Sequence, residues 1–216
     1  MAKRRKVGNL LALALLALLA PGDPMHPYQM AQLLRRTGKD QDINIKWGSL
    51  YTVVGNLEKH GFVEATGSDR EGRRPERTSY TITAGGRAEL LDWLRELMAA
   101  PEPEYPRFAA ALSVLSVLGP DEATALLEQR ERALADDIAT QRAQLEGAAR
   151  VPRLFLVESE YTLAMLSAEA AWVRSLIAEL RGGTLSGLAE WRDYHETGRR
   201  PVEWLRMLWE GEPPTR

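Results

Sequence analysis

The sequence contains no cysteine and only three histidines among 216 residues. The lack of cysteine excludes disulfide bonds, thiol catalysis, iron–sulfur clusters and Cys-ligated zinc. The histidines, His26, His60 and His195, lie far apart in the sequence, which disfavours a His-rich metal site. We therefore expect no metal and no cofactor, and we expect a cytoplasmic protein that receives any signal through a non-covalent pocket or a partner.

The sequence also lacks the short motifs of phosphate-binding loops, dinucleotide-binding folds, zinc proteases and serine hydrolases. We therefore predict that the protein is not an enzyme. A strong excess of one charge is missing too, because the net charge is only −2. That balance hides an asymmetry: residues 1–97 carry 15 Lys and Arg against 11 Asp and Glu, and residues 98–216 carry 13 against 19. A basic first half beside an acidic second half predicts that only the first half contacts a polyanion.

The chain begins with a basic cluster, Lys3-Arg4-Arg5-Lys6, and then residues 10–20 are all Leu or Ala. This pattern is compatible with a secretory signal peptide or with the buried first helix of a soluble domain. The apolar run is shorter than the roughly 20 residues that span a bilayer. We favour the buried helix, because the next 60 residues read as a compact unit that lacks its first helix without this segment. The basic cluster then forms a solvated arm or contacts DNA phosphates.

Apolar spacing predicts two further helices, over residues 27–36 and 47–60. Pro27 suits the first turn of its helix, and Gly61 suits the position just after the other. Within 47–60, one stripe is apolar and the opposite face is polar, with Ser49, Tyr51, Thr52, Asn56 and Lys59. Three short helices joined by tight turns are typical of a helix-turn-helix, whose last helix enters the major groove of DNA.

Residues 62–66 and 77–83 are rich in β-branched and aromatic side chains and flank a Gly-rich, charged segment. They predict a β-hairpin with a long tip. Arg73 and Arg74 lie at the tip, with Arg70 and Arg77 beside them. The cluster is either a solvated turn or a contact to a phosphate backbone or minor groove, which we favour directly after a helix-turn-helix. Thr83 is the expected cap of a fourth helix, 84–98.

Two motifs carry a resemblance to a known family: WGSLYTVVGNLEKHGFV at residues 47–63 and EGRRPERTSYTITAGGR at residues 71–87. With the Pro-Met-His-Pro-Tyr turn at residues 24–28, they resemble the PadR family of bacterial transcriptional regulators. The similarity continues more weakly to about residue 181 and is closest to the larger, phenolic-acid-regulator-like subgroup. Pro27 and Gly55 depart from the family pattern, in which Gly and a larger residue are usual.

The resemblance implies a homodimeric winged-helix repressor that binds a near-palindromic operator and is released by a small molecule. It implies that Ser49 and Tyr51 contact DNA and that Arg73 and Arg74 are wing contacts. Together with the polar helix face, it gives the predicted DNA-binding residues Lys46, Ser49, Tyr51, Thr52, Asn56, Lys59, Arg73, Arg74 and Arg77.

The second half starts with a Pro-rich joint at residues 99–106 and a short helix marked by Phe108, Leu112, Leu115 and Leu118. Two long helices are predicted at 121–149 and 153–181. Their apolar stripes are either buried against a second copy or covered in an intrachain hairpin. We favour the dimer, and the predicted dimerisation residues are Leu156, Leu163, Leu166, Val173 and Leu180.

Three aromatic residues are candidates for a ligand pocket between the halves: Trp93, Tyr161 and Trp172. Plain core packing is the alternative for each of them. The last segment, residues 182–216, holds Trp191, Trp204 and Trp209, and a short helix is predicted from Pro201. We expect this extension to pack on the helical domain or across the dimer.

The sequence thus predicts a mainly α protein with three parts. Residues 1–98 form a winged helix-turn-helix with a two-stranded β wing, residues 107–181 form a helical dimerisation and effector domain, and residues 182–216 form a Trp-rich extension. The predicted function is a ligand-responsive transcriptional regulator whose partners are operator DNA, a second copy and a small-molecule effector. The alternative is a helical adaptor protein whose winged helix does not bind specific DNA.

Overall fold

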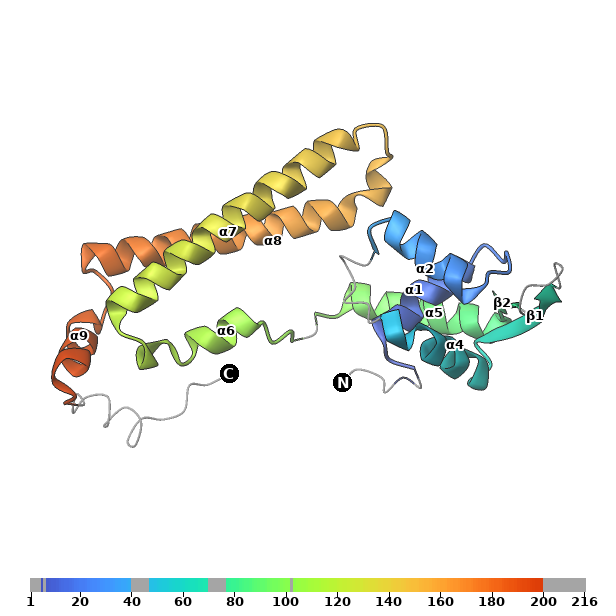
Figure 1. Ribbon diagram of the computed structural model, residues 1–216, viewed down its shortest axis with the longest axis horizontal. Helices are drawn as coiled ribbons and strands as arrows, with labels where there is room; N and C mark the ends of the chain where they lie inside the picture. The colour runs from blue at the N-terminus through green and yellow to red at the C-terminus, as the bar shows by residue number, and fades with distance from the viewer. Residues whose placement is uncertain (1–4, 6, 40–46, 70–76, 102, 200–216) are drawn as a thin grey trace. The chain divides into compact units, whose positions relative to one another are not determined.

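The computed structural model describes residues 5, 7–39, 47–69, 77–101 and 103–199 (Figure 1). The chain forms two compact units, residues 1–104 and residues 105–216. Within the described residues, the fold is mainly helical with one antiparallel two-stranded sheet. This confirms the predicted fold class. No helix among the described residues is both long and apolar enough to cross a membrane.

Helix α1, Leu10–Leu19, lies at the centre of the first unit. The Asn9 side chain caps it by accepting a hydrogen bond from the Leu11 N–H at 2.8 Å. Most of its circumference is buried, which explains why its sequence is apolar on all sides. The apolar run therefore forms the core helix that the buried-helix interpretation predicts.

Helices α2, Pro27–Arg36, and α4, Leu50–Lys59, pack against α1. A 3₁₀ turn, η1, covers Trp47–Ser49 and directly precedes α4. The predicted helix 47–60 is thus a 3₁₀ turn followed by an α-helix. Pro27 occupies the first turn of α2, as predicted. Gly61 adopts φ +72° after α4, a conformation that glycine reaches without a Cβ clash.

The sheet pairs β1, Val63–Asp69, with β2, Arg77–Ile82, from Val63 opposite Ile82 to Asp69 opposite Arg77. A register shift between Ala65 and Ser68 marks a bulge. On the other edge of β2, Tyr80 forms a bridge with Met25. The hairpin therefore has the form of a wing, attached at its base to the turn before α2.

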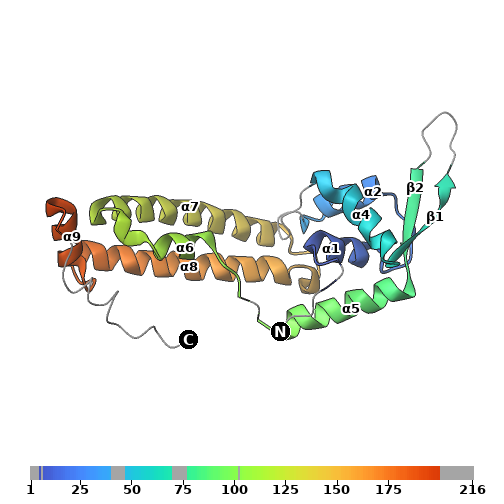
Figure 2. The same cartoon turned by 90° about the horizontal axis from the view of Figure 1, so that it is seen from below.

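Helix α5, Ala84–Ala99, follows the wing and packs under α1 (Figure 2). The Thr83 side chain caps it, as predicted, by accepting from the Gly86 N–H at 3.0 Å. A Cβ atom at Gly86 would lie 2.0 Å from the Phe62 carbonyl oxygen. Only glycine therefore lets α5 start this close to the turn that joins α4 to the wing.

The second unit is built on α7, Pro120–Gly147, and α8, Val157–Gly182, which run side by side in both views (Figures 1 and 2). Their contact buries Leu127 and Leu134 of α7 with Val173 and Leu180 of α8. Ion pairs at the edges join Glu131 to Arg174 and Glu128 to Arg181. Smaller elements are α6, Arg107–Leu112; η2, Leu115–Val117; and η3, Arg153–Phe155.

Helix α9, Leu188–Thr197, was not predicted from the sequence. It buries Leu188 and Trp191 in the core of the second unit. The Trp191 indole N–H donates to the Leu118 carbonyl at 2.8 Å, and His195 Nε2 lies 3.0 Å from the Ser116 carbonyl. This part of the extension therefore packs on the helical unit. The predicted helix from Pro201 lies outside the described residues.

Candidate nucleic-acid interface

Helix α4 has two chemically distinct faces. Leu50, Val53, Val54 and Leu57 are buried, as the i, i+3, i+4, i+7 spacing predicts. The opposite face exposes four of the predicted DNA-binding residues: Tyr51, Thr52, Asn56 and Lys59. Ser49 lies half-buried at the N-cap position. The buried stripe fixes the rotation of α4, so that polar groups able to bond base edges and phosphates all face outward.

Tyr51 is 63% exposed, and its ring lies edge-on to His26 with 6.5 Å between ring centroids. His26 caps α2: its Nδ1 accepts from the Tyr28 N–H, and Gln29 accepts from the His26 N–H. The beginnings of α2 and α4 therefore meet at this aromatic pair. Helix N-termini attract anions, so the pair lies where a phosphate is favoured.

The start of α4 is fixed to the end of α2 by a second contact. The guanidinium of Arg35 lies 4.1 Å from the centroid of the Trp47 ring. A cation–π contact of this kind contributes roughly 0.5–1 kcal/mol where it is exposed. It connects the last turn of α2 to Trp47, the first residue of the 3₁₀ turn that leads into α4.

Of the remaining predicted contacts, only Arg77 belongs to the part of the chain that the structure describes. The backbone of Arg77 begins β2 opposite Asp69. Lys46, Arg73 and Arg74 lie outside the described residues. The base of the wing is fixed, because the Thr81 hydroxyl donates to the Gly22 carbonyl at 3.2 Å and Arg87 donates to the Ala20 carbonyl.

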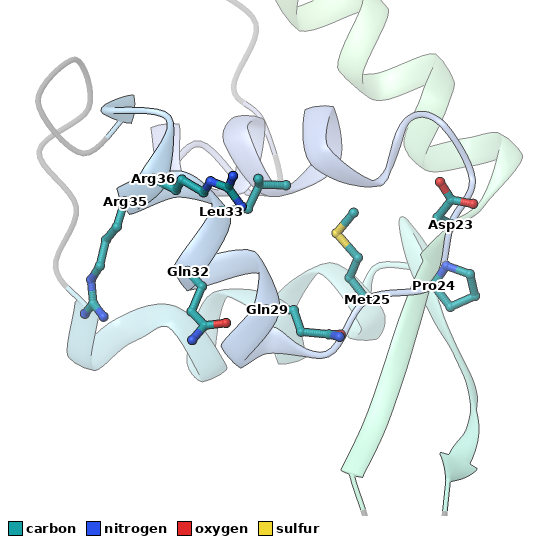
Figure 3. Close-up of a pocket in the computed structure, with 8 residues that line it drawn as sticks. All are labelled: Asp23, Pro24, Met25, Gln29, Gln32, Leu33, Arg35 and Arg36. Atoms are coloured by element: carbon teal, nitrogen blue, oxygen red, sulfur yellow. The ribbon is translucent and has the colours of Figure 1, made fainter.

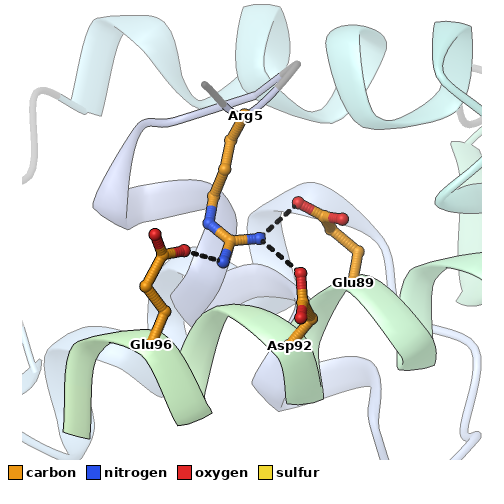
Figure 4. A network of polar contacts seen from close by, with 4 residues as sticks. All are labelled: Arg5, Glu89, Asp92 and Glu96. Atoms are coloured by element: carbon orange, nitrogen blue, oxygen red, sulfur yellow. Dashed lines mark hydrogen bonds and ion pairs between the residues drawn. The ribbon is translucent and has the colours of Figure 1, made fainter. Parts of the chain in front are cut away.

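The N-terminal basic cluster shows a different role at Arg5, its one described member. The Arg5 side chain is only 5% exposed and forms ion pairs with Glu89, Asp92 and Glu96 on α5 (Figure 4). Burial by itself lowers the pKa of Arg5. The hydrogen bonds and charges of Glu89 and Glu96 outweigh this effect and raise the pKa above its ordinary value. Arg5 therefore fastens the chain to α5 and is not a solvated arm residue.

A separate hollow of about 870 Å³ lies between the segment before α2 and the exposed side of that helix (Figure 3). It is open and carries charges of both signs, Asp23 at one end and Arg35 and Arg36 at the other. The described residues predicted to contact DNA do not line it. The hollow and the polar face of α4 are therefore distinct surfaces of the first unit.

The residues predicted to bind a ligand lie in unlike surroundings. Trp93 is buried in the core of the first unit, with the Arg5 guanidinium 5.3 Å from its ring centroid. Tyr161 and Trp172 lie on α8 and are 67% and 49% exposed. Trp172 lies edge-on to Phe108 of α6, with centroids 6.1 Å apart. The assignment of these three residues to a pocket stays a prediction.

The predicted dimerisation residues differ in how deeply they are buried within the chain. Val173 and Leu180 are buried within the chain, and Leu166 packs against the same cluster. Leu156 and Leu163 are half-buried. Within one chain, Val173 and Leu180 belong to the core shared with α7, and the assignment of the five residues to a dimer interface stays a prediction.

Comparison with known proteins identifies the first unit. Residues 15–92, from α1 into α5, match the Transcriptional regulator PadR-like family. The chain carries a PadR-like domain. This confirms the resemblance seen in the sequence motifs, and the subgroup stays a prediction. A comparison with curated proteins found no match.

Several solved structures share the PadR-like fold. Bacillus subtilis PadR in complex with operator DNA superposes with a TM-score of 0.66 and 21% identity, over 80% of this chain and 99% of that chain. The same protein in complex with p-coumaric acid gives 0.65 and 20%, with the same coverage. The Vibrio cholerae virulence activator AphA gives 0.62 and 18%, again over 80% and 99%. At these identities the likeness shows the fold.

The PadR-like domain also contains residues that sequence reasoning did not assign to the interface. In the sequence, His26 belongs only to a turn motif, and no pattern there links Arg35 to Trp47. Each acts through a partner on another helix, so periodicity within one helix gives no signal for them. The residues that the sequence did identify on α4 needed only that helix's own period.

Proposed function

We propose that this chain is a transcriptional regulator, a repressor, that binds operator DNA through α4 and the wing. The observation that carries the proposal is the polar face of α4, presented by a buried apolar stripe in a PadR-like domain. In the proposed complex, Tyr51, Thr52 and Asn56 contact base edges in the major groove. Lys59 and the wing arginines Arg73, Arg74 and Arg77 contact phosphates, and Lys46 does so just before η1.

We propose that it acts as a homodimer formed through the helical unit. On α8, Val157, Tyr161 and Met165 are each at least 47% exposed. At about 100° per residue, these positions lie within about 80° of one another around α8, and their centre is roughly 110° from that of Val173 and Leu180. A second copy covering this stripe gives a twofold assembly, and a dimeric regulator of this kind reads two operator half-sites one turn of DNA, about 34 Å, apart.

We further propose a small-molecule effector that acts without a cofactor and without catalysis. Bacillus subtilis PadR has been solved both with operator DNA and with p-coumaric acid. The protein described here contains half-exposed aromatic side chains in its helical unit, which suit an aromatic or apolar effector. A regulator of this kind acts in the cytoplasm, where it reaches both DNA and diffusible metabolites.

The test is binding of the purified full-length chain to the DNA upstream of its own gene. Fluorescence anisotropy at several salt concentrations compares this DNA with a scrambled duplex of equal length, and light scattering gives the mass of the free and bound protein. We expect selective binding by a dimer. A folded protein that does not bind this DNA even at low salt contradicts the proposal and favours the adaptor alternative.

A further inference from the structure

A cavity of about 420 Å³, open to solvent on one side, lies within the helical unit, between α6 and the α7–α8 pair. Helix α6 and the residue before it contribute five of its eight lining residues, among them Arg107, Phe108 and Leu112. Arg130 of α7 and Glu169 and Trp172 of α8 form the opposite wall. Its size is sufficient for a small ligand, since ligand sites in proteins begin at about 300 Å³.

The walls of this cavity are organised around the Phe108 ring. The Arg130 guanidinium lies 3.7 Å from the Phe108 centroid, and the Trp172 ring stands nearly perpendicular to it at 81°. Arg130 is itself held in place, because its Nε donates to Glu169 Oε1 at 2.6 Å. Aromatic and guanidinium groups thus occur together on a surface that is fixed by contacts between three helices.

The charges of the cavity favour an anion. Two guanidinium groups, of Arg107 and Arg130, face one carboxylate, of Glu169. Glu169 already pairs with Arg130, which leaves the charge of Arg107 uncompensated within the described part of the chain. Trp172 is 49% exposed and offers an indole surface for stacking. The combination fits a planar aromatic ring with a negatively charged substituent.

Helix α6 is weakly attached. It has six residues, no side-chain cap and no buried residue. Short helices of this kind have little stability of their own, so their docking is the low-energy opening step of a domain. Phe108, packed with Arg130 and Trp172, is its principal anchor on the α7–α8 pair.

We propose that this cavity binds a small aromatic anion and that the bound ligand holds α6 on α7 and α8. Because α6 forms more than half of the lining, the site is complete only while α6 is docked. A ligand that binds only this state stabilises it by mass action. If the six residues of α6 undock and extend, their span grows from about 9 Å to about 20 Å, so the ligand keeps the segment that follows the DNA-binding unit shorter by that difference.

This consequence for the connecting segment rests on the proposed function, but the binding itself does not. The probe is 2-naphthoate, titrated into the DNA-free full-length protein by isothermal calorimetry, with cyclohexanecarboxylate and 2-naphthylmethylamine as shape and charge controls. We expect 2-naphthoate to bind at least ten-fold more tightly than either control. We also expect it to slow hydrogen exchange of the amides of residues 107–112.

Two variants locate the site. Phe108→Ala and Arg107→Gln are each expected to weaken 2-naphthoate binding about ten-fold or more. The matched controls, Phe155→Ala and Arg132→Gln, change exposed residues outside the cavity and are expected to bind like wild type. Arg107→Gln tests the site without removing the Phe108 anchor, so it remains informative if Phe108→Ala undocks α6.

The proposal is overturned by any of three results: no binding of 2-naphthoate at millimolar concentration, equal binding by Arg107→Gln and wild type, or unchanged exchange in residues 107–112. Operator binding of wild type and of Arg107→Gln without ligand is measured in parallel. If wild type and Arg107→Gln both bind operator DNA but wild type does not bind 2-naphthoate, the cavity proposal fails and the proposed function stands. If wild type binds 2-naphthoate but not operator DNA, the cavity proposal stands and the proposed function fails.

Discussion

The Thr83 hydroxyl donates a hydrogen bond to the Gly61 carbonyl oxygen at 2.6 Å. Gly61 ends α4 and Thr83 follows β2, so one side chain joins the end of the recognition helix to the end of the wing. The Thr83 hydroxyl oxygen also accepts a hydrogen bond from the Gly86 N–H and so caps the start of α5. The two parts proposed to contact DNA therefore share one rigid attachment point.

Replacing Thr83 by Val removes this attachment while keeping the shape of the side chain. We expect the free energy of unfolding to fall by about 1–2 kcal/mol, since a helix cap and a hydrogen bond are lost together. Urea unfolding followed by circular dichroism measures the change. Thr83→Ser retains the hydroxyl and is expected to lose less; a Val variant as stable as wild type contradicts the role of the hydroxyl.

Tyr51→Ala tests the exposed face of α4. We expect the variant to lose more affinity for operator than for random DNA, because a base contact carries sequence information and a phosphate contact does not. Fluorescence anisotropy measures both affinities. Tyr105→Ala, which changes a tyrosine that is 91% exposed in the other unit, serves as the control. Equal losses on the two DNAs mean that Tyr51 only positions the helix.

The double change Arg73→Ala and Arg74→Ala tests the tip of the wing. Each phosphate contact contributes close to one unit to the slope of log affinity against log salt concentration. We expect the slope to fall by up to about 2 and the affinity to weaken. The control removes two exposed arginines of α7, Arg132 and Arg142. A slope equal to that of wild type excludes wing contacts by this pair.

Arg5→Gln tests the ion pairs on α5. Three carboxylates, two of them largely buried, lose their cation. We expect the first unit to lose on the order of 2 kcal/mol of stability, because a poorly hydrated charge without a partner is costly. Urea unfolding measures the change. Arg5→Lys keeps the charge but not the forked geometry, and its stability is expected to lie between those of wild type and Arg5→Gln. If Arg5→Gln is as stable as wild type, the ion pairs of Arg5 contribute no net stability.

Tyr161→Glu with Met165→Glu tests the proposed dimer. Two carboxylates in the middle of the exposed α8 stripe would have to be desolvated in the interface. We expect the protein to shift from dimer to monomer in sedimentation velocity experiments, with its circular dichroism spectrum unchanged. Gln144→Glu, on an exposed position of α7, is expected to remain dimeric. A dimer that survives the double change uses another surface.

Much of the fold follows from local sequence signals. The α4 stripe, the Thr83 cap, the Gly61 turn and Pro27 each act within a few residues, where periodicity and capping rules apply. Helix α9 escaped these rules because its buried side chains, Leu188 and Trp191, are too few to give a helical period. Its position depends on hydrogen bonds to carbonyls more than 70 residues earlier.

Long-range pairing explains the other differences. The sequence predicts that Arg5 belongs to a basic arm, because its carboxylate partners are 84 to 91 residues away and give no local signal. The same limit applies to the α8 leucine positions. Their spacing shows an apolar stripe, but a stripe alone does not state whether α7 or a second copy covers it.

The division of α4 into a buried and an exposed face has a consequence for protein engineering. Tyr51, Thr52, Asn56 and Lys59 are all exposed, while the contact between Arg35 and Trp47 holds the start of the helix independently of them. Substitutions at exposed positions usually change stability by less than about 0.5 kcal/mol. A library randomised at these four positions would therefore sample new DNA target sequences on an unchanged scaffold.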